Sequence, residues 1–304
     1  MLNNTYDFLN LAQEIFQAQP FLWYGLFLFI GGCLGSFLGV IWIRYTKIYH
    51  FNLMNEAIEY LHDYNSSLFK TKKLKDLLYK IPFTLSSPQS SCDHCGKPIK
   101  FYHNIPFFSY LFLNGKCAYC KNKISPAIFF IETIFALCLL SISIKTGVSL
   151  EAFIWSIFWF LMAGVFLVDL KTKFIPETFI MPAFLLGIIL QLSNYEALPS
   201  LQTGILSALV VYLIIATIVK TTSFILKKEA MGGGDLQLFA LFGLWLGLNY
   251  MLPLIIVSCF MGIVFSIYYK AKEKEEASPF GPSIISAAFI VWLFNIQLMI
   301  PGIS

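Results

Sequence analysis

The chain has 304 residues, of which 58% are hydrophobic and only 12% are charged, and its mean hydropathy is +0.72. A composition this apolar excludes an ordinary soluble globular domain and indicates a membrane protein. The formal net charge of +4 says little by itself, so the positions of the charges matter more than their sum.

Apolar segments long enough to be transmembrane helices recur along the whole chain, since a helix crossing the hydrocarbon core needs about 20 mostly apolar residues. The fourth and sixth of them are short. We expect an all-α polytopic membrane protein with about eight transmembrane helices, at residues 21–43, 126–144, 150–168, 177–193, 202–220, 236–248, 251–270 and 280–298.

The basic residues lie almost entirely on one side of these eight spans. The loops on that side carry 20 of the 21 Lys and Arg residues, and only Lys145 lies on the other side. By the positive-inside rule these loops are cytoplasmic and both termini lie outside. The first residues have no basic n-region, so we expect no cleaved signal peptide and a first span that stays in place. The cytoplasmic loops are residues 44–125, 169–176, 220–235 and 271–279, with Lys270 counted in the last.

The long loop after the first span divides into two parts. In its first half Phe51, Met54, Ile58 and Leu61 follow three- and four-residue spacing, which predicts an amphipathic helix. The basic segment 70–80 comes next. It could contact anionic lipid or substrate, or it could be a solvated helix face of the kind common beside membranes.

The second half of this loop contains two CxxC pairs separated by 21 residues, namely Cys92 with Cys95 and Cys117 with Cys120. Two such turns complete a tetrahedral four-thiolate zinc site, and Gly96 suits the tight turn of a zinc knuckle. A cytoplasmic position disfavours disulfides. A redox CxxC is the alternative, but it needs only one pair. With four protein ligands the zinc would be structural, in a small cytoplasmic domain between helices 1 and 2.

Two aspartates stand at ends of spans, where charge is costly. Asp169 ends the third span and Asp235 begins the sixth, so both are expected at the cytoplasmic boundary on separate helices. Two neighbouring carboxyl groups share a proton, so one can activate water while the other protonates a carbonyl oxygen. This is the chemistry of an aspartic protease. The simpler alternative makes Asp235 a helix N-cap and Asp169 an interfacial residue.

Three consecutive glycines precede Asp235. Gly232 and Gly234 are expected to support the active site, because glycine lets backbone and substrate approach closely and permits positive φ just before a helix. The GxxxxGK[ST] pattern of an ATP-type phosphate loop is absent from the sequence.

Five stretches of the chain carry a resemblance to a known family, namely GSFLGVIWIR, SCDHCGKPIKFYHNIPFFSYLFLNGKCAYCKNKIS, VDLKTKFIPE, GGGDLQLFALFG and PFGPSI. They resemble the type IV prepilin leader peptidase family, whose members are bifunctional peptidases and N-methyltransferases. The resemblance covers about Gly35 to Ile284 and matches poorly between about residues 45 and 85. Gly39, Glu177 and Gln237 depart from the usual residues of the family.

The resemblance implies that Asp169 and Asp235 are the catalytic aspartates. The substrates would be prepilin-like and pseudopilin precursors, cut after a glycine on the cytoplasmic face of the bacterial inner membrane. The new N-terminal residue would then be methylated with S-adenosylmethionine. No nucleic-acid partner is expected.

Two further residues match family positions, one just before the third paired cysteine and one just inside the second span. Gly115 is a candidate methylation-site residue, with a turn glycine ahead of a zinc knuckle as the alternative. Glu132 matches an acidic position, and a hydrogen bond between helices would explain it equally well.

These inferences divide the chain into an N-terminal segment with the first span (1–44), a cytoplasmic loop (45–125) with the zinc domain at 90–125, and a seven-helix peptidase domain (126–304). A peptidase without methyltransferase activity is one alternative. A transporter or assembly protein with a zinc docking domain is a more distant one.

Overall fold

The structure is a computed structural model that describes residues 14–64, 84–85, 87, 89–92, 94–100, 106–228, 230–272 and 278–298. Within these ranges the regular elements are helices, accompanied by two isolated β-bridges next to the cysteines. The all-helical fold expected from the apolar segments is therefore confirmed for the described part of the chain.

Five helices are long and apolar enough to cross a membrane. They contain between 21 and 45 residues, or about 30 to 70 Å at a rise of 1.5 Å per residue. They are α2 (Pro20–Tyr64), α5 (Pro126–Thr146), α6 (Leu150–Thr172), α8 (Leu201–Leu226) and α10 (Leu248–Lys272).

Three other apolar helices are shorter: α7 (Glu177–Leu192), α9 (Gly233–Leu246) and α11 (Gly281–Leu293). With 13 to 16 residues they measure about 20 to 24 Å, less than the hydrocarbon thickness of about 30 Å. The structure thus supports a multi-pass membrane protein, and the count of eight spans stays a prediction.

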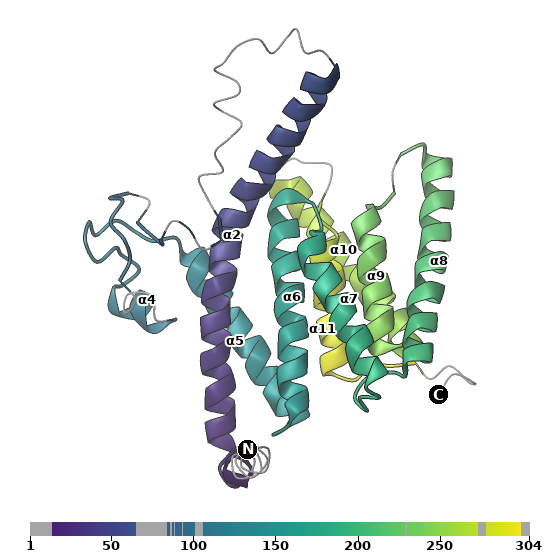
Figure 1. Ribbon diagram of the computed structural model, residues 1–304, viewed down its shortest axis with the longest axis horizontal. Helices are drawn as coiled ribbons and strands as arrows, with labels where there is room; N and C mark the ends of the chain where they lie inside the picture. The colour runs from purple at the N-terminus through teal and green to yellow at the C-terminus, as the bar shows by residue number, and fades with distance from the viewer. Residues whose placement is uncertain are drawn as a thin grey trace. The chain divides into compact units, whose positions relative to one another are not determined.

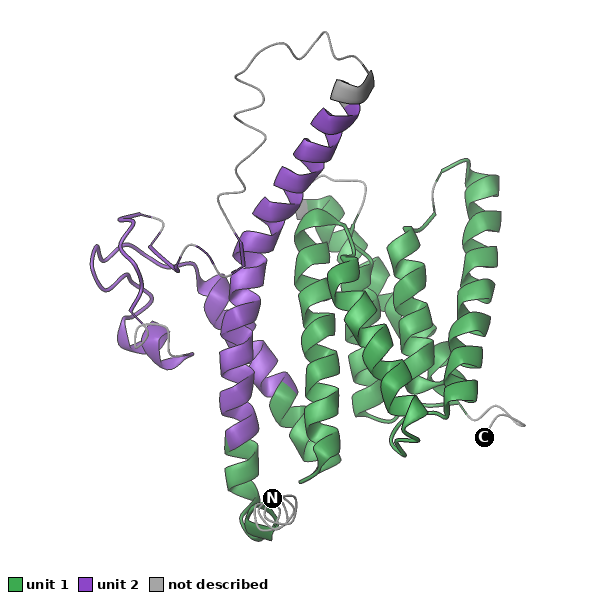
Figure 2. Cartoon of the chain, viewed as in Figure 1, with its two compact units in different colours: residues 1–25, 139–304 green, residues 26–138 purple. Residues whose placement is uncertain are grey.

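The chain forms two compact units (Figure 2). Unit 1 consists of residues 1–25 and 139–304, and unit 2 consists of residues 26–138. Unit 1 therefore contains both aspartates of the sequence analysis, whereas unit 2 contains the four paired cysteines and Gly115.

Helix α9 is the centre of unit 1. It contacts α7, α8, α10 and α11, which surround it in the bundle of Figure 1. A helix that is apolar on every side is stable only when neighbours cover all of its faces, and α9 is buried over nearly its whole length. Its Trp245 ring stacks on Phe158 of α6, with 4.1 Å between ring centroids.

Helix α8 contrasts with α9, because most of its apolar side chains are exposed. In water such a surface would be unstable, whereas lipid tails are as apolar as leucine. One face of α8 approaches α9 closely at Gly243, where a Cβ atom would lie 3.1 Å from the Ala208 backbone.

Unit 2 is held together by small residues between α2 and α5. A Cβ atom at Gly35 would lie 2.7 Å from the Cα atom of Glu132, and one at Gly39 would lie 3.2 Å from the Ile128 side chain. The GSFLG stretch thus brings the two helices into backbone contact.

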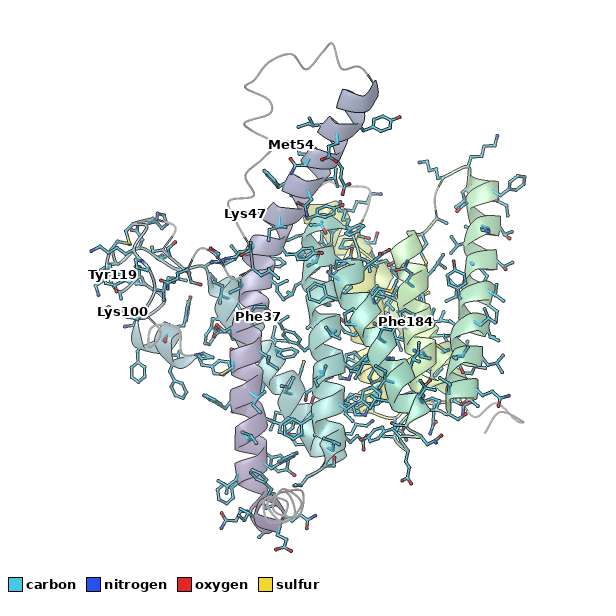
Figure 3. The ribbon with its side chains drawn as sticks, viewed as in Figure 1. Phe37, Lys47, Met54, Lys100, Tyr119 and Phe184 are labelled. Atoms are coloured by element: carbon cyan, nitrogen blue, oxygen red, sulfur yellow. The ribbon has the colours of Figure 1, made fainter. Side chains whose placement is uncertain are left out.

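The expected amphipathic helix after the first span is not a separate element. Helix α2 continues without a break to Tyr64, so Phe51, Met54 and Ile58 extend the first span. The Met54 side chain, labelled in Figure 3, is exposed. The basic segment 70–80 and the side chain of Leu61 lie outside the described residues.

Candidate active site

Asp169 lies in the last turn of α6. The helix ends at Thr172, and its C-cap residue Lys173 adopts the left-handed conformation (φ 54°) and donates its backbone N–H to the Asp169 carbonyl at 2.9 Å. The Asp169 side chain is only 3% exposed, and its Oδ2 atom has no hydrogen-bond partner among the described residues. Asp169 is therefore enclosed by protein, and its place at the membrane interface stays a prediction.

Asp235 lies in the first turn of α9 and is 8% exposed. Gly232 occupies the N-cap position, and the Asp235 backbone N–H donates to the Gly232 carbonyl at 3.2 Å. The interpretation of Asp235 as the N-cap is therefore wrong. In the first turn its carboxyl group is near the positive end of the helix dipole, which favours negative charge.

The glycines before Asp235 act by allowing close packing. None of them has positive φ, so the positive φ that glycine permits is not used at these positions. A Cβ atom at Gly234 would lie 2.7 Å from Ile175 Cβ, one at Gly232 would make an ordinary 3.5 Å contact with Asp235 Oδ2, and one at Gly233 would meet nothing within 4 Å. Close approach is thus required at Gly234.

The two aspartates come together although 66 positions separate them in the sequence. Their carboxyl groups are near enough to interact electrostatically. This agrees with Figure 1, where the C-terminal end of α6 and the N-terminal end of α9 are on the same side of the bundle. The structure therefore brings the two carboxyl groups near each other, and their catalytic role stays a prediction.

A third element reaches the pair. Helix α11 begins at Gly281, where a Cβ atom would lie 2.5 Å from Asp169 Oδ2 and 3.4 Å from Ile175 Cδ1. The sequence pattern assigns Gly281 no role beyond its place in PFGPSI, one of the stretches that carry the resemblance. The sequence did contain a signal for this role. A Gly-Pro pair begins a predicted span on the same side of the membrane as both aspartates.

The four paired cysteines of unit 2 converge on one point. Their sulfur atoms all lie within 4.8 Å of one another, and Cys92 Sγ is 3.8 Å from Cys120 Sγ. Zinc–sulfur bonds of about 2.3 Å in a tetrahedron place the sulfur atoms about 3.8 Å apart. The cluster is therefore suited to a four-coordinate metal ion.

The two CxxC turns have the same backbone geometry. The Cys92 carbonyl accepts from Gly96 N–H at 2.9 Å, and the Cys117 carbonyl accepts from Lys121 N–H at 3.0 Å. Both donors have positive φ, 68° at Gly96 and 59° at Lys121. The tight turn expected at Gly96 is confirmed, and Lys121 makes its counterpart without glycine.

A cavity of about 980 Å³ lies in unit 2 beside the cysteines. Figure 3 labels two lining residues, Lys47 on α2 and Tyr119 in the cysteine segment. Gly115 also lines the cavity. Its φ is 65°, and a Cβ atom there would lie 2.9 Å from the Tyr110 hydroxyl oxygen, which is too close. Gly115 is therefore a turn glycine that also lies at a ligand-sized cavity.

Glu132 of α5 is buried and ties three segments of unit 2 together. Its Oε2 atom accepts the backbone N–H of Phe107 at 3.1 Å, and its carboxyl group also bonds the Ser36 side chain of α2. The hydrogen bond between helices considered as an alternative for Glu132 is present.

The fold and these groups define a class: a multi-pass membrane protein with a buried carboxyl pair at helix ends and a tetracysteine centre. Two family models match the chain, the bacterial peptidase A24 N-terminal domain at residues 29–146 and the type IV leader peptidase family at residues 154–267. The chain belongs to the type IV leader peptidase family and is an enzyme of that family.

Several relatives bear the name prepilin leader peptidase/N-methyltransferase. The Pseudomonas putida protein is 30% identical over 88% of this chain and 90% of its own length. The Legionella pneumophila protein is 29% identical over 86% of this chain and 88% of its own length. The Neisseria gonorrhoeae protein is 30% identical over 70% of this chain and 73% of its own length. No solved structure matches the chain.

Proposed function

We propose that this chain is an aspartic endopeptidase of the bacterial inner membrane that removes the leader of prepilin-like precursors and then N-methylates the new terminus. The observation that carries the peptidase assignment is the pairing of the buried Asp169 and Asp235 carboxyl groups at the ends of two helices. The names of the relatives support the substrate class and the second activity.

The proposed peptidase reaction follows from two neighbouring carboxyl groups in apolar surroundings. Both cannot ionise cheaply, so one is ionised while the other holds a proton. The ionised group takes a proton from water as the oxygen attacks the scissile carbonyl carbon, and the protonated group donates to the carbonyl oxygen. The carbon–nitrogen bond then breaks, and the leaving amine takes up a proton.

The position of the pair suits a substrate that lies partly in the membrane. By the positive-inside rule, the basic loops favour a cytoplasmic position for the ends of α6 and α9 and an outside position for both termini. A polar leader would stay in the cytoplasm while the apolar segment after it stays in the bilayer. The bond between them would then lie at the depth of Asp169 and Asp235.

Zinc is the metal we propose for Cys92, Cys95, Cys117 and Cys120, because four thiolates at this spacing are typical of structural zinc. With all four positions filled by protein, the ion has no site for water or substrate. Its role is to fix the two turns and the chain between them.

S-adenosylmethionine, the donor implied for methylation, supplies an electrophilic methyl group when bound. The cavity of unit 2 has a volume suited to a molecule of this size. Arg44, Lys47 and Lys116 line it and would pair with a carboxylate, and Trp42 and Tyr110 offer aromatic faces for an adenine ring. We propose that Gly115 belongs to this site through its position in the same wall.

The test is cleavage of a prepilin-like precursor in membranes by the wild type, Asp169→Asn and Asp235→Asn, followed by mass spectrometry of the new N-terminus. We expect the wild type to remove the leader and both variants, present at normal levels, to leave it in place. A product heavier by one CH₂ group would establish methylation, and an unmodified product would favour a peptidase alone. Cleavage by both variants would show that the pair is not catalytic.

A further inference from the structure

We propose that Gly281 is a positioning residue of the peptidase site, because its backbone amide holds the Asp169 carboxyl group and its lack of a side chain makes room for that contact. This inference rests on the proposed peptidase function and goes beyond it by assigning a role to α11.

The first turn of α11 leaves one backbone donor for Asp169. The N–H groups of Ser283 and Ile284 both donate to the Phe280 carbonyl, at 3.0 and 3.2 Å, and Pro282 has no N–H. The Gly281 amide is thus left without a backbone acceptor, as first-turn amides usually are. The Asp169 carboxyl group lies directly beside Gly281 and is the acceptor that we assign to this amide.

The contact depends on the absence of a side chain at position 281. A Cβ atom there would lie 2.5 Å from Asp169 Oδ2 and 3.3 Å from its Cγ, much closer than van der Waals contact allows. The carboxyl group is buried, and Ile175 Cδ1 would stand 3.4 Å from the same Cβ. A methyl group at this position would therefore displace either the Asp169 side chain or the start of α11.

Ile175 links this contact to the other half of the pair. Its Cβ atom packs against Gly234, one residue before Asp235, and its Cδ1 atom packs near Gly281. The N-terminal ends of α9 and α11 thus meet around one side chain beside Asp169. Asp169 Oδ2 is buried and has no hydrogen-bond partner among the described residues, so its position is set by the packing around it.

The experiment compares Gly281→Ala with two matched glycine variants in cleavage kinetics on a prepilin-like precursor. Gly187→Ala places its Cβ atom 2.7 Å from Trp245 Nε1, away from the described contacts of the aspartates, and Gly233→Ala meets nothing within 4 Å. We expect Gly281→Ala to lower kcat by about 10- to 100-fold, as a misplaced catalytic group does, with KM within about twofold of the wild type.

We expect Gly187→Ala to lower the melting temperature while kcat of the folded enzyme is kept, and Gly233→Ala to resemble the wild type. Should Gly281→Ala not fold, the double variant with Ile175→Val removes the Cδ1 atom behind it and gives the new methyl group room to shift. A wild-type kcat in either folded variant, or a raised KM with unchanged kcat, would overturn the proposal. Failure of the wild type itself to cleave would instead refute the proposed function.

Discussion

Gly234 and Gly233 are neighbours in sequence, yet only one of them is packed. A Cβ atom at Gly234 would lie 2.7 Å from Ile175 Cβ, which belongs to the rigid part of that side chain, whereas Gly233 has open space around it. We therefore expect the chemistry of the site to depend on glycines as well as on the aspartates, because a glycine without a side chain lets neighbouring segments approach closely.

We predict that Gly234→Ala lowers the free energy of unfolding by about 1–3 kcal/mol, the usual cost of forcing an extra group into a packed interior. It should also slow leader cleavage, because Asp235 follows directly. Thermal unfolding and cleavage rates of the purified protein check both effects. Gly233→Ala is the matched control, and equal losses in the two variants would contradict the packing argument.

Gly115 combines two properties that a substitution can separate. We predict that Gly115→Ala destabilises unit 2 by about 1–2 kcal/mol, because φ is 65° there and the Tyr110 hydroxyl is close. Gly115→Asn tolerates positive φ better and tests the site itself. Methylation lost in both variants with normal zinc content would support a role in the site, and restored methylation in the asparagine variant would indicate the turn alone.

At the scale of elements, the two CxxC turns bring four thiols together, and the pKa values of two of them are shifted in opposite directions: that of Cys120 is raised to about 11, and that of Cys117 is lowered. Backbone N–H groups of Cys120 and Tyr119 hydrogen-bond the Cys117 sulfur and lower the pKa of that thiol to about 6. A lowered pKa favours the thiolate that binds metal at neutral pH. As the pH falls through this range, protons compete with the metal for the sulfur atoms.

We therefore predict zinc release on acidification from pH 7 towards pH 5, measured by metal analysis after gel filtration in detergent. Cys117→Ser should lower zinc content at every pH and lower the melting temperature of unit 2. Leader cleavage should persist in this variant, because both aspartates belong to unit 1. Loss of cleavage together with zinc would show that the tetracysteine centre supports the peptidase as well.

At the scale of the whole molecule, the distribution of lysine and arginine predicts which ends of the helices face the cytoplasm. Glu196 precedes α8 and Lys228 follows it, and both side chains are exposed. In intact cells we expect a membrane-impermeant thiol reagent to label Glu196→Cys and to label Lys228→Cys only after permeabilisation. The reverse pattern would place the carboxyl pair on the outer face and contradict the proposed substrate orientation.

The sequence by itself determined the parts that depend on local pattern. Apolar runs predict helices because backbone groups in lipid must bond within their own segment, and the CxxC spacing predicts a four-sulfur cluster because each turn directs two thiols to one point. Both are found among the described residues. The two aspartates could be identified as candidates from the sequence, because a charged residue at the end of a membrane span is costly and therefore uncommon.

Only the tertiary structure decided what depends on contacts between distant segments. The structure shows that α2 is one helix to Tyr64 and that Gly281 lies against Asp169. It also shows that Gly234 packs closely on Ile175 and does not have positive φ. A glycine in a sequence does not reveal which neighbour needs its empty space, because that neighbour can lie more than a hundred residues away. Packing geometry is a property of the assembled helices, so it is settled only when they meet.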